Sequence, residues 1–294
     1  FLFSFPITIY NFYEINLLTI INNVIIVPFV TALLFPFTLI TFLLPFLDPL
    51  LNVGIELLEW ISQFLNYLQI NLVVPKVNFI FFFLYYIGVY FIYKGKWKTI
   101  FYLIFLVISV KILPFLNSNT YVYFLDVGQG DSTLIVGSHG NYAMLIDTGG
   151  KIKFEQEDWE VRNKEYDGAS NIITFLKSLG ITKLDLLVGT HGDADHMGEA
   201  INLVNNFVVD KVVFNNGSYN DLEKSLIQVL EKKNIPYFQN LSEINLGNNK
   251  FYFLNDKEFG DENNNSIVMY AEFERIKFLF MGDAGIEVEK YLLE

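Results

Sequence analysis

Hydrophobic residues follow two different patterns along the chain, and the first is membrane-like. Residues 15–47 carry no charged side chain, and this run of 33 residues exceeds the ~20 that a helix needs to cross a bilayer. Pro28, Pro36 and Pro45 interrupt the run. Because proline removes a backbone donor and clashes with the preceding turn, we predict a proline-broken pair of hydrophobic segments rather than one straight helix. Such a break fits either a kinked helix in an ordinary bundle or a discontinuity that lines a pore.

Three further segments continue the membrane-like pattern. Residues 50–70 repeat apolar side chains at helical spacing, with Glu56 and Glu59 on other faces, which predicts an amphipathic helix at an interface or against a neighbouring helix. Residues 77–93 and 99–116 predict two spans joined by a short loop with three lysines. Because lysine-rich loops favour the cytoplasm, the chain that follows is expected on the extracytoplasmic side.

From residue 119 onward the apolar runs become short and alternate with polar turns. Strands are expected at residues 121–126, 132–136, 142–147, 184–188, 211–215, 236–239, 250–254, 266–273 and 276–281. Helices are expected at residues 168–180, 197–206 and 220–233. Strands first, then alternating helices and strands, then strands again predict a layered α/β domain.

Charge divides the chain at the same place. Of the 294 residues, 52% are hydrophobic, which excludes a disordered protein. The first 118 residues hold five bases and four acids, whereas the remainder holds 15 bases and 28 acids, for net charges of +1 and −13. We therefore expect a membrane domain at residues 1–117 and an acidic domain at 118–294. The chain begins with Phe1 and is expected to be a fragment, and the absence of cysteine excludes disulfides and thiolate metal sites.

Candidate chemistry is concentrated just after the strand expected at residues 184–188. His191, Asp193, Asp195 and His196 fall within six residues, and a turn after a strand can fold such side chains around one point. Imidazole together with carboxylate suits Zn²⁺, Mn²⁺ or Fe²⁺. A polar loop with a fortuitous cluster is the alternative, but two of the three histidines of the chain lie here.

Other acidic residues also follow expected strands. Asp283 comes after the last strand and could bridge two metal ions about 3.5–4 Å apart, although a simple turn aspartate has the same place in the sequence. Asp147 also ends a strand, and its expected role is to orient ligands from outside the metal shell. The glycine-rich turn at 126–132 contains Gln129 and Asp131, and its backbone amides could approach a phosphate or simply form a tight hairpin.

These motifs carry a resemblance to a known family. Five occur in order: FLDVGQGDS at 124–132, LIDTGG at 145–150, THGDADHMG at 190–198, NNSIV at 264–268 and MGDA at 281–284. Together they resemble the metallo-β-lactamase-type domain of the ComEC family of DNA-uptake channels. Residues 10–36 resemble the end of the competence membrane region of that family.

The resemblance implies a fold, a function and a set of ligands. It implies an αββα sandwich, truncated at its end, behind a membrane region that conducts one DNA strand while the exterior domain degrades the other as a metal-dependent nuclease. By the same resemblance, His191 and Asp193 would bind one divalent ion (Mn²⁺ or Zn²⁺), Asp195 and His196 would bind a second, and Asp283 would bind both. Catalysis would rest on Asp195 and Asp283. DNA, the membrane and other competence proteins are the implied partners.

The chain also departs from the family pattern. Asp193 stands where the superfamily usually has histidine, which makes the site harder and favours Mn²⁺. No histidine follows residue 196, so two usual ligands are missing. Asn264, Asn265 or Ser266 are the candidates to replace one of them, and metal binding is expected to be incomplete.

Net charge keeps a second function open. A domain at −13 repels DNA, and phosphate binding normally uses lysine and arginine. The alternative is an uptake channel whose exterior domain is inert and serves gating or partner contact. A small-molecule hydrolase, the third class, has little need of a membrane half.

Overall fold

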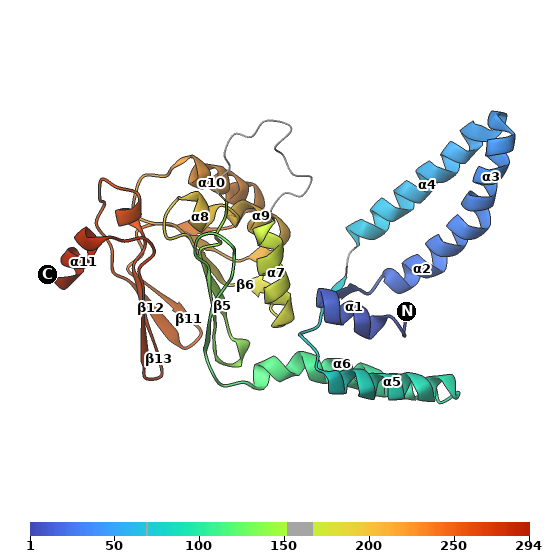
Figure 1. Cartoon of the computed structure of the whole chain (residues 1–294), viewed down its shortest axis with the longest axis horizontal. Helices are drawn as coiled ribbons and strands as arrows, with labels where there is room; N and C mark the ends of the chain where they lie inside the picture. Colours follow the sequence, from blue (N-terminus) through green and yellow to red (C-terminus); the bar gives the residue numbers. More distant parts are fainter. Residues whose placement is uncertain (69, 152–166) are drawn as a thin grey trace. The chain divides into compact units, whose positions relative to one another are not determined.

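The computed structural model describes residues 1–68, 70–151 and 167–294. The chain divides into two compact units, Phe1–Val107 and Ile108–Glu294 (Figure 1). The domain boundary between residues 117 and 118, expected from the change in hydropathy and charge, stays a prediction.

Helices make up most of the first unit. They are α1 (Phe5–Phe12), α2 (Thr19–Pro28), α3 (Phe35–Leu43), α4 (Asp48–Tyr67), α5 (Phe79–Tyr93) and α6 (Thr99–Ile112), the last of which runs into the second unit. A short antiparallel pair of strands, β1 (Glu14–Asn16) and β2 (Asn71–Val73), was not expected from the sequence. The predicted amphipathic helix is confirmed as α4.

The proline-rich run differs from its prediction because Pro28 and Pro36 do not break the helix, which continues from Thr19 to Leu43. The helix ends before Pro45, where Leu44 leaves helical geometry and a 3-10 turn, Pro45–Leu47, follows. A π-helical stretch, Phe29–Leu34, joins α2 to α3, and the Phe35 amide donates to the carbonyl of Val30, one residue further back than in an α-helix. This wider turn ends just before Pro36, and it relieves the clash that the Pro36 ring would make with the preceding turn.

Within the part of the chain that the structure describes, two helical stretches are long and apolar enough to cross a membrane. They are Thr19–Leu43 and Thr99–Leu116, and only 6% of each apolar window is buried in the structure. The apolar helix α5 is shorter. It pairs with α6 as the predicted hairpin, since Gly88 leaves room for Leu103 and the Tyr102 hydroxyl donates to the carbonyl of Leu84 (3.3 Å). The exposed apolar faces of these helices are suited to a lipid environment rather than to the core of a water-soluble domain.

Two sheets form the framework of the second unit. The six-stranded sheet has the order β10-β9-β7-β5-β4-β3, with parallel pairing from β10 to β5 and antiparallel pairing from β5 to β3. Its strands are β3 (Tyr121–Phe124), β4 (Thr133–Val136), β5 (Ala143–Ile146), β7 (Leu186–Val188), β9 (Val212–Val213) and β10 (Tyr237–Phe238). The second sheet is an antiparallel meander of β11 (Glu243–Leu246), β12 (Asn249–Phe253), β13 (Met269–Phe273) and β14 (Ile276–Phe280).

Among the described residues, the second unit also contains five further α-helices and a short strand pair. The helices are α7 (Gly168–Ser178), α8 (Ala194–Met197), α9 (Ala200–Asn206), α10 (Asp221–Lys233) and α11 (Ile286–Leu293). The strand pair is β6 (Lys183–Leu184) with β8 (Val208–Val209).

Alternate residues of one strand face two different cores. In β5, Ala143 and Leu145 belong to a core shared with α7, α9 and α10, whereas Met144 and Ile146 belong to a core shared with the second sheet. This is the two-residue period of a strand that is covered on both faces. The unit is therefore layered as helices, sheet and sheet, with α11 after the last strand (Figure 1).

Two glycines allow turns to approach the loop after β7. A side chain at Gly130 would place its Cβ 1.5 Å from the backbone oxygen of Asp195, and one at Gly150 would place it 2.3 Å from that of Ala194. Gly130 also has a φ of +73°, which disfavours every residue with a side chain. The turns at 126–132 and 147–150 are thus packed backbone to backbone against the residues of α8.

Helix α10 begins with a complete capping box. The Asn220 side chain accepts from the amides of Leu222 and Glu223 (both 3.0 Å), and Glu223 Oε2 accepts from the Asn220 amide (2.8 Å). Glu223 is fully buried, and its Oε1 has no hydrogen-bond partner among the described residues. Burial raises the pKa of Glu223, the bond from Asn220 lowers it, and the charges of Glu262 and Asp193 raise it, to about 7 in all.

We predict that Gly130→Ala destabilises the second unit by about 2 kcal/mol or more, because the new Cβ meets backbone atoms that cannot move aside. Gly260→Ala is the matched control, since no atom of the described residues would lie within 4 Å of a Cβ there, and its effect should stay within about 0.5 kcal/mol. Denaturant unfolding of the detergent-solubilised chain, followed by circular dichroism, measures both. Equal effects of the two variants would contradict the close approach.

We predict a second effect on stability from the buried Glu223. Its pKa in the folded protein, about 7, lies above its ordinary value of 4.5, so the folded state holds the Glu223 proton more tightly than the unfolded chain does. The contribution of the protonated side chain to the free energy of unfolding is therefore fully present below pH 4.5 and is lost as the pH rises through 7. Glu223→Gln keeps the capping box but cannot ionise, so the variant should not show the roughly 2–3 kcal/mol decrease in the free energy of unfolding that wild type shows over this pH range. Unfolding free energies of both proteins between pH 4.5 and 8 test this, and parallel curves would show that Glu223 does not titrate there.

Candidate metal centre

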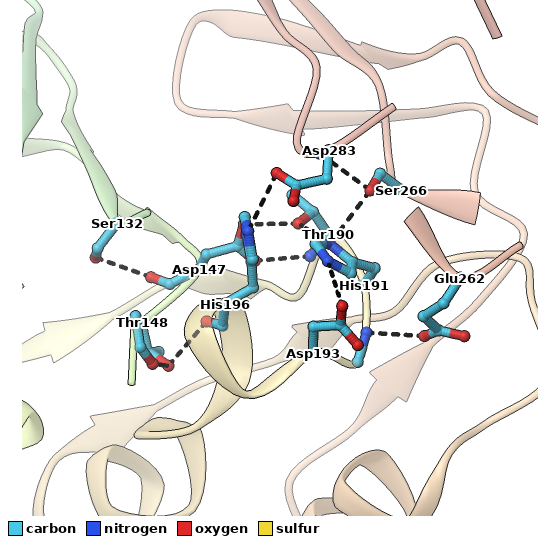
Figure 2. Close-up of polar contacts among 12 residues, drawn as sticks. Ser132, Asp147, Thr148, Thr190, His191, Asp193, His196, Glu262, Ser266 and Asp283 are labelled. Atoms are coloured by element: carbon cyan, nitrogen blue, oxygen red, sulfur yellow. Dashed lines mark hydrogen bonds and ion pairs between the residues drawn. The ribbon is translucent and has the colours of Figure 1, made fainter. Parts of the chain in front are cut away.

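The candidate centre lies where strands of both sheets end. β7 leads to Thr190 and His191, β5 leads to Asp147, and β14 leads to Asp283. His196 lies on the single turn of α8. Figure 2 shows these side chains around one point, with Ser266 reaching in from the segment before β13. The motifs that are separated in the sequence therefore meet in space.

Three of the expected ligands come together. One ligand atom from each of His191, His196 and Asp283 lies within 4.8 Å of the other two. His196 Nε2 and Asp283 Oδ1 are 3.2 Å apart, and the two imidazole rings have centroids 4.2 Å apart. Both histidines are buried, whereas Asp283 is exposed, so the group opens to solvent on its carboxylate side.

The Asp147 carboxylate orients both histidines: it acts on His191 through Thr190 and on His196 directly. Its Oδ1 accepts from the Thr190 amide (2.8 Å), and its Oδ2 accepts from the Thr190 hydroxyl (2.6 Å). Since the single hydroxyl proton goes to the carboxylate, Thr190 can only accept from His191 Nδ1, which lies 3.2 Å away. A proton on Nδ1 leaves the lone pair of neutral His191 on Nε2, the form that binds metals.

His196 contacts Asp147 directly. Its Nδ1 lies 2.9 Å from Asp147 Oδ2, so this nitrogen donates and Nε2 faces Asp283. Burial lowers the pKa of His196, but the hydrogen bond to Asp147 and the charges of Asp147, Asp283 and Asp195 raise it to about 9. A metal cation bound at His196 Nε2 would take the place of the proton on that nitrogen. The carboxylates that favour the protonated imidazole would therefore also favour a bound cation.

Ser266 connects the last ligand to the first. Its hydroxyl oxygen lies 3.2 Å from His191 Nδ1 and accepts from the Asp283 amide (3.2 Å). Asn264 Oδ1 accepts from the Gly285 amide (3.0 Å), and Asn265 Oδ1 accepts from the Phe259 amide (2.6 Å). Of the three residues considered as replacements for a missing ligand, Ser266 contacts a histidine, and the two asparagine oxygens hold neighbouring loops.

The remaining predicted residues lie around this group. Asp193 Oδ2 is 3.6 Å from His191 Nε2 on a half-exposed side chain. Asp195 is partly exposed and lies close enough to His196 to affect its pKa. Neither carboxylate belongs to the three-residue group. Gln129 and Asp131 are exposed in the turn beside Asp195, and their carbonyls accept from Gly150 and Gly149.

The donor set fits a divalent cation. His191 Nε2 is fully buried and has no hydrogen-bond partner within the described ranges, although a buried acceptor of this kind normally has one. Two imidazoles and a carboxylate at one point are the ligand types that Zn²⁺ and Mn²⁺ share. An ion bound there would satisfy the unpaired nitrogen.

Sequence reasoning missed two residues that hold the loop between the ligands. Glu262 accepts from the Gly192 amide (3.0 Å), and Asn220 donates to the Gly192 carbonyl (2.7 Å). The capping box formed by Asn220 and Glu223 is readable in the sequence as a polar N-cap followed three residues later by glutamate. Nothing in the sequence, however, links either contact to Gly192, which is 28 and 70 residues away.

Two family models match the chain in succession. Residues 125–294 match the metallo-beta-lactamase superfamily, and residues 1–99 match the competence protein family. The metallo-beta-lactamase-type fold predicted for the second half is thereby confirmed, and this fold implies divalent metal ions.

The chain is also similar to individual proteins. The ComE operon protein 3 of Bacillus subtilis (strain 168) is 25% identical over 323 residues, which cover 99% of this chain and 40% of that protein. The chain therefore spans less than half the length of this relative. A metallo-beta-lactamase from Staphylococcus aureus subsp. aureus COL is 18% identical over 56% of this chain and 43% of its own, with a TM-score of 0.36. The metallo-beta-lactamase fold protein YhfI from Bacillus subtilis is 14% identical over 56% and 60%, with a TM-score of 0.34.

The order of the two domains supplies the family. A competence-protein region precedes a metallo-beta-lactamase region, and one relative is similar across both. The chain belongs to the metallo-beta-lactamase superfamily through residues 125–294, and the competence-protein region before them makes it a chain of the ComEC type.

Proposed function

We propose that this chain takes part in DNA uptake and that residues 118–294 form a metal-dependent phosphodiesterase that degrades the strand left outside. The observation that carries the proposal is the convergence of His191, His196 and Asp283 around a buried imidazole nitrogen without a partner among the described residues. The competence-protein match supports DNA as the substrate. Other competence proteins are the proposed partners of the complete machinery.

The proposed ligands extend beyond the three that converge. His191 and Asp193 would hold one cation, Asp195 and His196 a second, and Asp283 would contact both. A bound divalent cation supplies Lewis acidity, which stabilises charge on a phosphoryl oxygen and makes water acidic enough to act as a nucleophile near neutral pH. A carboxylate at Asp193 in place of an imidazole favours Mn²⁺, although the set also accommodates Zn²⁺.

The side chains of the chain have defined tasks in this proposal. Asp147 and Thr190 hold the ligand nitrogens of both histidines toward the centre. Asp283, exposed beside His196, is placed to contact substrate as well as metal. The exposed turn around Gln129, packed against Asp195, would offer backbone amides to the phosphodiester.

One observation favours a second function. The acidic half has a net charge of −13, which opposes close approach of DNA unless cations or another surface compensate for it. Under this second hypothesis, the domain does not cleave DNA and instead gates the channel or contacts partner proteins. The two functions differ in one measurable property, cleavage by a folded and metal-loaded protein.

Asp283→Asn tests the enzymatic proposal. We expect the chain in detergent to cleave end-labelled single- or double-stranded DNA with Mn²⁺ or Zn²⁺, and we expect this variant to lose at least about 100-fold, because even residues behind a metal shell change activity by 10–100-fold. Asp195→Ala should lose cleavage to a similar extent as Asp283→Asn. Asp210→Asn removes the same charge from the Lys183 ion pair, away from the centre, and should leave cleavage unchanged. A folded, metal-loaded wild type without cleavage would favour the gating function.

The same proposal places residues 1–117 in the membrane and the acidic domain outside the cytoplasm. Because the chain has no cysteine, single cysteines can report the side on which a residue lies. In intact cells stripped of their wall, Gly260→Cys should react with a membrane-impermeant maleimide, whereas Lys96→Cys in the lysine-rich loop should react only after permeabilisation. Both positions are exposed. The reverse pattern would place the acidic domain inside.

A further inference from the structure

Gly192, between two proposed ligands, is held on both sides by side chains from distant elements. Its amide donates to Glu262 Oε1 (3.0 Å), and its carbonyl accepts from Asn220 Nδ2 (2.7 Å). Gly192 itself is buried, and a Cβ there would lie 2.0 Å from Asn220 Nδ2. Both polar groups of this residue are therefore satisfied without water, and we call the two hydrogen bonds the Gly192 contacts.

The first of these side chains is oriented by a helix. Asn220 Oδ1 accepts from the Leu222 and Glu223 amides at the start of α10. Because the oxygen is committed to these two donors, the nitrogen of the same planar amide must point the other way, toward Gly192. Glu223 closes the capping box through the Asn220 backbone, which holds the backbone of Asn220 as well.

The second side chain, Glu262, comes from the loop between β12 and β13. Glu262 precedes a 3-10 turn, Asn263–Asn265, that leads directly to Ser266. Figure 2 shows Glu262 beside Asp193, on the side of the centre away from Asp283. One loop thus supports the centre twice, through Ser266 at His191 and through Glu262 at Gly192.

We infer that Asn220 is a positioning residue for the metal centre. By fixing the Gly192 peptide groups, it fixes the direction in which the neighbouring His191 and Asp193 present their ligand atoms, and Glu262 completes the same task from the other side. Helix α10 supplies no expected ligand, yet its N-cap lies one hydrogen bond from the ligand loop. The inference rests on the proposed metal centre but not on DNA cleavage.

Asn220→Ser separates positioning from capping. Serine is as good an N-cap as asparagine, but its hydroxyl, committed to the helix, lacks the amide group that reaches Gly192. With the full chain in detergent, we expect the dissociation constant for Mn²⁺ to rise about 10-fold, the lower end of the effect of residues behind a metal shell. The visible absorption spectrum of bound Co²⁺, which reports ligand geometry, should shift as well.

Asn78→Ser is the matched control. Asn78 is the N-cap of α5 in the other unit, where its side chain accepts from the Phe81 amide (3.1 Å). The same substitution there should leave both the Mn²⁺ affinity and the Co²⁺ spectrum unchanged. Thermal unfolding of the three proteins shows whether each cap is retained.

Glu262 provides a second comparison that remains valid if Asn220→Ser fails to fold. Glu262→Gln and Glu262→Ala both remove the negative charge, but only glutamine keeps an oxygen that can accept from Gly192. Mn²⁺ should bind about five- to tenfold more weakly to the alanine variant than to the glutamine variant.

The outcomes are distinguishable. If wild type binds neither Mn²⁺ nor Co²⁺, the proposed metal centre is wrong. If wild type binds them and Asn220→Ser binds equally, with an unchanged spectrum, the positioning role is wrong and the centre stands. Equal affinities of the two Glu262 variants would likewise remove Glu262 from this role.

Discussion

The carboxylate of Asp147 is the interaction on which the centre depends. It accepts three hydrogen bonds, from the Thr190 amide, the Thr190 hydroxyl and His196 Nδ1. Asp147 adopts a left-handed backbone with φ of +56°, a conformation that an aspartate tolerates better than most residues. Its own amide extends the pairing of β5 with β7 by donating to the Val188 carbonyl (2.8 Å). A single buried charge therefore joins the ends of two parallel strands and sets both histidines.

The arrangement of strands explains why these groups can meet. β5, β7 and β9 are parallel neighbours, so their carboxyl ends lie at one edge, where open α/β sheets commonly place their sites. The turns at that edge are then packed together without side chains at Gly130 and Gly150. The second sheet contributes from its own edge through Ser266 and Asp283. The site is thus a junction of the two sheets, built from loops on rigid strands.

The sequence predicts most of the longer strands and helices and the five motifs, but it does not predict the short pair β1–β2, strand β11, helix α11 or the contacts between motifs. Alternation in β5 and the order of the five motifs were readable because they are local. The π-helical stretch after Pro28 was not, since it depends on how a turn widens rather than on residue type. Nor could local pattern reveal that Ser266 contacts His191, or that Asn220 and Glu262 contact Gly192, because these pairs are separated by 28 to 75 residues. Such contacts are set by the assembled sheets and not by any one segment.

Acidity and metal binding are linked in this unit. The carboxylates at Asp193, Asp195 and Asp283 contribute to the charge of −13. Two of them, Asp283 and Asp195, act together with Asp147 to raise the pKa of His196 to about 9. A field strong enough to hold a proton on a buried imidazole also attracts a divalent cation, because both are positive charges at the same nitrogen. If the unit is a phosphodiesterase, its attraction for a phosphate comes from the bound ions and not from its own side chains. Substrate binding, and not only cleavage, would then depend on the metal, which is how so acidic a surface could act on a polyanion.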